Sequence, residues 1–190
     1  MPSPKPFSSG GQRRAVFFDR DGVLNEAISR DGKPHPPASL DDLVLLPEAR
    51  AAVDLVHDAG FVAICVTNQP DVARGTLERS AADAMNNYVA EELGLDDLVA
   101  CFHDEADGCA CRKPRPGMML EAAGKWDLSL PESYVVGDRW RDVEAGARAG
   151  CYTILVDRGW KERQAEIEPN ARVNSALGAA NWIVRHRGEK

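Results

Sequence analysis

Residues 15–25 read Ala-Val-Phe-Phe-Asp-Arg-Asp-Gly-Val-Leu-Asn, four apolar residues followed by a short acidic stretch. An apolar run of this length is typical of a strand that is buried on both faces. Further apolar runs at 61–66, 134–136 and 152–156 have the same character. Segments with helical spacing separate these runs, so the chain is predicted to form an α/β domain with a central parallel sheet in three layers.

The helices of this domain are predicted from apolar residues that recur three and four positions apart. We expect them over about 49–56, 81–88, 116–123 and 141–149, with a weaker one over 174–186 packed on the outside. Ligands of such sheets bind beyond the carboxyl ends of the strands. The polar residues that follow each strand are therefore the candidates for function.

Length and composition limit the class of protein. The chain has 190 residues, 44% of them hydrophobic, and a net charge of −7, which argues against a broad nucleic-acid surface. No apolar run reaches the roughly 18 residues of a membrane span, and the first residues lack the apolar core of a secretory signal. We expect a flexible tail over 1–12 and one domain over 13–190, in a cytoplasmic monomer that binds neither nucleic acid nor membrane.

Asp19 and Asp21 stand one residue apart after the first strand, and Gly22 would allow a tight turn there. One carboxylate could attack phosphorus while the other moves protons on the leaving oxygen and the incoming water. A lone pair of this kind is also common in solvated loops. The first strand end therefore needs support from the others.

Three other segments also carry residues that could bind phosphate or Mg²⁺. Each of these residues could instead have a purely structural or surface role. Thr67 ends the second strand and could hold phosphate oxygens or cap a helix, and Lys113 could be a phosphate-binding cation or a surface charge. Asp138 and Asp142 could hold Mg²⁺ or begin a helix. A carboxylate near a phosphate meets repulsion of about 4 kcal/mol per charge pair at ~4 Å, which a cation must offset.

Together, the segments 18–25, 66–69, 111–114 and 136–142 resemble the motifs of the haloacid dehalogenase (HAD) superfamily of phosphohydrolases. Within subfamily IIIA they are most similar to the branch of heptose 1,7-bisphosphate 7-phosphatases and histidinol phosphatases. The resemblance covers about residues 15–156. It implies a HAD fold. Only about 45 residues separate the first two motifs, too few for a separate cap domain, so we expect loops, including 26–46, to shape the pocket.

The resemblance also implies roles for individual residues. Asp19 would form an aspartyl-phosphate, Asp21 would be the general acid and base, and Thr67 and Lys113 would stabilise the phosphoryl group. Mg²⁺ would be held by the Asp19 carboxylate, the Asp21 carbonyl and Asp138. The remaining implied residues are Asp142, which would lie close to Mg²⁺ as a candidate for its outer shell, and the substrate-binding set Asn25, Asn68, Gln69, Arg112 and Arg139.

A cluster of cysteines precedes Arg112 and Lys113. Three thiols and an imidazole are a common ligand set for a structural zinc ion, and the same branch of phosphatases carries this arrangement. Four protein ligands leave no open position for catalysis, so the zinc would stiffen the loop that carries the two cations. The predicted ligands are Cys101, His103, Cys109 and Cys111.

The expected function is Mg²⁺-dependent hydrolysis of a small sugar phosphate. The leading hypothesis is removal of the 7-phosphate of heptose 1,7-bisphosphate. A histidinol phosphatase would need the same machinery and differ only in its pocket. A related phosphotransferase, which passes the phosphoryl group to an alcohol, is a further alternative. A non-catalytic zinc-bearing binding domain would be expected to lack one of the catalytic residues, and all of them are present.

Overall fold

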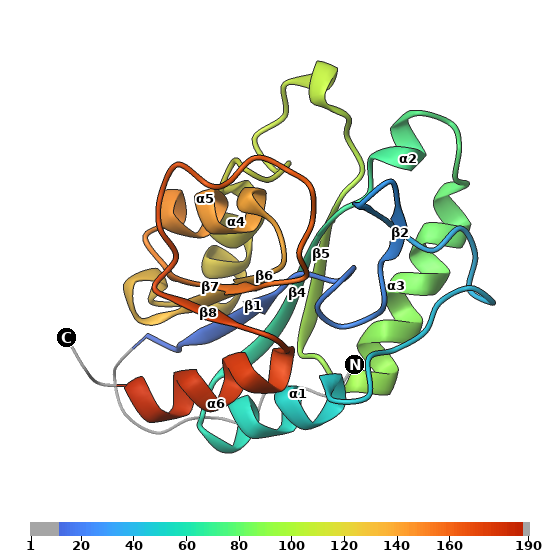
Figure 1. The fold of residues 1–190 in the computed structure, drawn as a ribbon. Coiled ribbons are helices and arrows are strands. Elements are labelled where there is room, and N and C mark those ends of the chain that lie inside the picture. Colours follow the sequence, from blue (N-terminus) through green and yellow to red (C-terminus); the bar gives the residue numbers. More distant parts are fainter. Residues whose placement is uncertain (1–11, 188–190) are drawn as a thin grey trace.

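A single parallel sheet organises the computed structural model, which describes residues 12–187 (Figure 1). The first 11 residues of the predicted tail lie outside the described part of the chain. The strand order is β5-β4-β1-β6-β7-β8. The strands are β1 (Ala15–Phe18), β4 (Val62–Asn68), β5 (Asp97–Cys101), β6 (Tyr134–Gly137), β7 (Tyr152–Val156) and β8 (Ala171–Val173).

Helices cover both faces of this sheet, which confirms the predicted three-layer α/β fold (Figure 1). One face carries α1 (Ala49–Asp58), α3 (Arg79–Leu93) and α6 (Ala176–His186), and the other carries α4 (Gly117–Trp126) and α5 (Trp140–Ala149). A short helix α2 (Pro70–Ala73) follows β4, and the 3₁₀ turns are η1 (Glu105–Asp107) and η2 (Leu130–Glu132). Among residues 12–187, no helix is both long and apolar enough to cross a bilayer.

The continuous apolar run of β1 is explained by this layering. Val16 and Phe18 belong to the core cluster under α1, α3 and α6, whereas Ala15 and Phe17 belong to the cluster under α4 and α5. All four side chains are fully buried. Because successive residues of a strand point to opposite faces, a strand covered on both sides needs apolar residues at every position.

A hairpin that we did not predict lies between β1 and α1. Strands β2 (Ile28–Arg30) and β3 (Lys33–His35) pair in antiparallel fashion and form a separate two-stranded sheet. Asp31 and Gly32 connect them with φ angles of 54° and 78°. Asp-Gly is a common sequence in two-residue hairpin turns, and this dipeptide was the available signal for the hairpin.

Candidate active site

The order of the strands brings the predicted motifs together. From β1 the chain extends the sheet first through β4 and β5 and then, on the other side, through β6 and β7. A crevice beyond the carboxyl ends is expected where the direction reverses in this way. A cavity of about 280 Å³ opens there, lined by Asp19, Asp21, Lys33, Pro34, His35, Pro36, Thr67, Asn68, Pro70, Asp71, Arg74, Arg112, Lys113, Arg139, Arg141, Asp142 and Glu162.

Asp19 follows β1 directly and is buried at the floor of this cavity. Burial raises its pKa to about 6, Lys113 opposes the rise, and the carboxylates of Asp142 and Asp21 add to it. The protein without a bound metal therefore disfavours the charged form of Asp19. A cation beside the carboxylate would reverse this preference.

Lys113 is the counter-charge already built into the site. Its ammonium group is 2.7 Å from Asp19 Oδ1 and 2.6 Å from Asp142 Oδ1, and it donates to the carbonyl oxygen of Val66 over 2.8 Å. Burial alone would lower the pKa of Lys113, but Asp142 and Asp19 outweigh that effect and raise it. The side chain is therefore held as a fixed positive charge next to Asp19.

Asp21 is held by several donors on the side away from the cavity. The fully buried guanidinium of Arg20 donates to both carboxylate oxygens at 3.0 and 3.1 Å. The side-chain amides of Asn25 and Gln69 each donate to Asp21 over 3.0 Å, and Gln69 also donates to Thr67 Oγ1 over 2.9 Å. Asn25 and Gln69 thus lie behind Asp21, outside the lining of the cavity.

Three buried carboxylates are placed to share a cation. One ligand atom from each of Asp19, Asp138 and Asp142 lies within 4.8 Å of the others. Asp138 Oδ1 is buried and finds no hydrogen-bond partner among residues 12–187. Burial raises the pKa of Asp138 well above its usual value, and the charges of Asp19 and Asp142 add to the rise. Oxygen ligands in this number and with this charge suit Mg²⁺.

The predicted zinc ligands also converge. Cys111 Sγ lies 3.1 Å from Cys101 Sγ, 3.4 Å from Cys109 Sγ and 3.3 Å from His103 Nδ1. Separations of this size fit four ligands around one zinc ion, with metal–ligand bonds of roughly 2.0–2.3 Å. The guanidinium of Arg112 donates to the carbonyl oxygen of His103 over 3.2 Å, which ties the cluster to the cavity.

Residues 101–111, which carry the predicted zinc ligands and are called the zinc-ligand loop, also hold arginines at the rim of the cavity. Asp104 accepts two hydrogen bonds from Arg74, at 2.7 and 2.8 Å, and lies 3.7 Å from Arg112. The hydrogen bonds from Arg74 hold the pKa of Asp104 at about 2. Glu105 is 3.3 Å from Arg141. Three arginines therefore line one side of the cavity in orientations set by two acids of the loop.

The other predicted substrate-binding residues take mixed positions. The Asn68 amide exchanges two hydrogen bonds of 3.0 Å with the backbone of Lys113, so it positions that residue as well as lining the cavity. Arg139 lines the cavity but forms an ion pair with Glu162. Sequence reasoning did not assign Arg74 or Arg141 to the site, although Arg141 stands between Asp138 and Asp142 in a predicted motif.

Comparison with known proteins gives consistent results. A family model described as HAD-hydrolase-like matches residues 110–179. A D-glycero-beta-D-manno-heptose-1,7-bisphosphate 7-phosphatase of Bordetella bronchiseptica is 34% identical, with 77% of this chain and 82% of that protein covered. A D-glycero-D-manno-heptose-1,7-bisphosphate 7-phosphatase of Thermosynechococcus vestitus is 33% identical, with 92% and 97% covered. The crystal structure of the D,D-heptose 1,7-bisphosphate phosphatase of B. bronchiseptica with magnesium and phosphate matches with a TM-score of 0.79 at 29% identity, covering 91% of this chain and 99% of that one.

Proposed function

The chain belongs to the heptose 1,7-bisphosphate 7-phosphatase family of HAD-like hydrolases, and on this basis we propose that it removes the 7-phosphate of D-glycero-D-manno-heptose 1,7-bisphosphate. Membership in the family confirms the resemblance inferred from the four motifs. It also makes the protein a phosphatase, as predicted. The identity of the sugar and the roles of single residues are the proposal.

One observation carries this function: a single cavity joins a buried nucleophile to a rim of arginines. Asp19 and Lys113 lie at its floor, and Arg74, Arg112 and Arg141 lie along its side. A substrate with two anionic ends matches this distribution of charge. One phosphate would reach the floor while the second bound the rim, where planar guanidinium groups favour phosphate oxygens.

The first half-reaction would transfer the phosphoryl group to the protein. A carboxylate oxygen of Asp19 attacks phosphorus, an O–P bond forms, and the bond from phosphorus to the sugar oxygen breaks. Asp21 gives its proton to the departing oxygen. Thr67 and Lys113 stabilise the negative charge on the transferring oxygens. In the second half-reaction Asp21 accepts a proton from water as the water oxygen attacks phosphorus. The bond from phosphorus to the Asp19 oxygen breaks, which releases inorganic phosphate and restores the Asp19 carboxylate.

The metal ions have separate tasks in this scheme. The carboxylates of Asp19 and Asp138 and the carbonyl of Asp21 would hold Mg²⁺, with Asp142 beside them. Asp138 Oδ1, which has no hydrogen-bond partner within residues 12–187, and the crowded buried acids fit such an ion. Bound Mg²⁺ would neutralise the repulsion between Asp19 and the phosphate. The cysteine cluster would hold a structural zinc ion that keeps Arg112 in place.

The packing of the core supports one structural domain. Both core clusters pack on the faces of one sheet, and the cavity lies beyond the carboxyl ends of strands of that same sheet. We therefore propose that residues 13–190 form one domain that acts on a small phosphorylated metabolite. We also propose that the protein is a cytoplasmic monomer. Sedimentation at catalytic concentrations would show a single species of one-chain mass.

The test is phosphate release in Mg²⁺ across a substrate panel. The panel contains both anomers of heptose 1,7-bisphosphate, heptose 7-phosphate, histidinol phosphate and hexose phosphates. We expect kcat/KM for one bisphosphate anomer to exceed that of heptose 7-phosphate by about 10-fold or more, since charge-assisted hydrogen bonds contribute about 1.5–3 kcal/mol. Equal values for the two, or a preference for histidinol phosphate, would contradict the proposed substrate.

A further inference from the structure

The segment that follows β7 folds back over the carboxyl ends of the strands and is fixed at two points. Arg158 Nε donates to the carbonyl oxygen of Gly22 over 2.8 Å, and the backbone N–H of Lys161 donates to that of Gly32, also over 2.8 Å. Lys161 packs so closely that a Cβ on Gly32 would lie 2.7 Å from its side chain. Trp160 lies between these two points, so the position of its indole is well defined.

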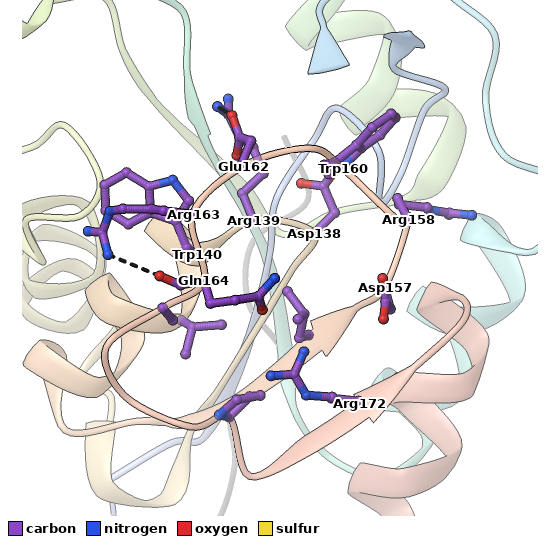
Figure 2. Close-up of a pocket in the computed structure, with 14 residues that line it drawn as sticks. Asp138, Arg139, Trp140, Asp157, Arg158, Trp160, Glu162, Arg163, Gln164 and Arg172 are labelled. Carbon is purple, nitrogen blue, oxygen red and sulfur yellow. Dashed lines mark hydrogen bonds and ion pairs between the residues drawn. The ribbon is translucent and has the colours of Figure 1, made fainter. Parts of the chain in front are cut away.

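The indole of Trp160 reaches the predicted metal site. Its Nε1–H donates to Asp138 Oδ2 over 2.6 Å, and Figure 2 shows the two side chains next to each other. On the other side, a Cβ on Gly22 would lie only 2.0 Å from the same oxygen. Asp138 Oδ2 is therefore enclosed by the indole and by the backbone of Gly22.

The two oxygens of Asp138 consequently differ. Oδ2 is occupied by Trp160, whereas Oδ1 is buried and has no partner in the described part of the chain. Asp142 is not free in this way, because its Oδ1 contacts Lys113 and its Oδ2 accepts the backbone N–H of Arg139. Asp19 Oδ1 also binds Lys113. Asp138 is the acid of this group whose orientation depends on a residue outside the predicted motifs.

We propose that Trp160 is a positioning residue of the metal site, which holds Oδ2 of Asp138 so that Oδ1 is presented to Mg²⁺. An indole N–H is only a donor, so it orients the carboxylate without competing for the cation. Groups that orient metal ligands commonly contribute about 10–100-fold to metal affinity. The inference rests on the metal site of the proposed function but not on the identity of the sugar.

The experiment compares Trp160→Phe with the wild-type protein and with Trp182→Phe. Phenylalanine keeps an aromatic ring and removes the N–H. Trp182 is a matched control, because it lies on α6, stacked on His186, away from the cavity. Binding of Mn²⁺ to zinc-loaded, substrate-free protein is followed by the loss of the free-ion paramagnetic resonance signal, with Mg²⁺ as competitor. Activation by Mg²⁺ is measured separately.

We expect Trp160→Phe to weaken binding of both ions by about 10-fold or more. Turnover should require correspondingly more Mg²⁺ and recover at saturation, while zinc content and Trp182→Phe remain at wild-type values. Ion affinity within twofold of wild type in Trp160→Phe would overturn the positioning role. Failure of the proposed function has a different signature, namely a wild-type protein that binds Mg²⁺ but releases no phosphate from the substrate panel.

Discussion

Asp19 must be ionised to attack phosphorus, yet the fold buries it beside two other carboxylates. We expect Asp19→Asn to lower kcat by about 10³-fold or more, because the amide keeps the volume and removes the nucleophile. Phosphate release measures the effect, and Asp54→Asn on the exposed side of α1 is the control. Substantial turnover by Asp19→Asn would rule out a covalent aspartyl-phosphate.

The same residue predicts how stability depends on pH. Asp19 has a pKa of about 6 in the folded protein and an ordinary value of 3.8, so between these values the folded state binds more protons than the unfolded state. Stability from this group is therefore greatest at low pH and falls as the pH rises towards 6. Denaturant unfolding of Mg²⁺-free protein should show this fall, and Asp19→Asn should reduce it. If the stability of wild type and of Asp19→Asn depended on pH in the same way, the raised pKa of Asp19 would be contradicted.

Lys113 gives a second test at the floor of the cavity. Its ammonium group contacts Asp19 and Asp142, and transferring oxygens would bind it most strongly as their charge increases. We expect Lys113→Ala to reduce kcat by about 10²-fold or more. A change in KM alone would mean that Lys113 binds the ground state and the transition state equally. Circular dichroism should verify that the variant is folded.

Single residues differ in how far the sequence could predict them. The acids after β1 and β6 could be placed together because parallel strands end at the same edge of the sheet. The orientation of Asn25 and Gln69 towards Asp21, and that of Trp160 towards Asp138, depends on tertiary contacts between segments far apart in the chain. No periodicity or local motif encodes such contacts.

At the scale of elements, the zinc-ligand loop is expected to control recognition of the second phosphate. Removing one ligand with Cys109→Ala should release zinc and loosen Arg112, which is bonded to the carbonyl of His103. The KM for the bisphosphate should rise by about 10-fold or more, and that for a monophosphate should change less.

Metal analysis and kinetics on the two substrates test this expectation. Cys151→Ala is the control, because it removes a buried thiol that is outside the cluster. Zinc-free protein with unchanged KM values for both substrates would show that the loop holds its arginines without the metal. In that case the acids Asp104 and Glu105 alone would suffice to orient them.

Elements with strong periodicity were predicted well, and those formed by pairing at an edge were not. The helices α1, α3, α4 and α5 lie where apolar spacing placed them, with ends that differ by a few residues. Strands β5 and β8 lie at the two edges of the sheet and were not predicted. The apolar run at 98–102 was the available signal for β5, and it was not interpreted as a strand. β8 is only three residues long and half-exposed, so it lacks a continuous apolar run. The hairpin is mostly polar and is defined by its turn, which periodicity does not detect.

For the whole molecule, stability and catalysis should be separable, because the core lies on the two faces of the sheet and the site lies beyond the carboxyl ends of its strands. The C-terminal helix α6 was predicted to pack on the outside, and it does form an outer layer. Its inner side is nevertheless part of the core, where Ile183 is fully buried in the cluster shared with α1. Ile183→Ala should therefore destabilise the fold by about 2–5 kcal/mol through lost contacts and a residual cavity.

Denaturant unfolding and steady-state kinetics on the same samples would check this separation. We expect kcat/KM of Ile183→Ala to stay within about twofold of wild type under conditions where the protein remains folded, since no atom of the cavity lining belongs to α6. Arg185→Ala, on the exposed side of the same helix, should change stability by no more than about 0.5 kcal/mol. A loss of activity in folded Ile183→Ala would instead mean that packing under the sheet sets the geometry of the strand ends, and that the site tolerates less displacement than its separation from the core suggests.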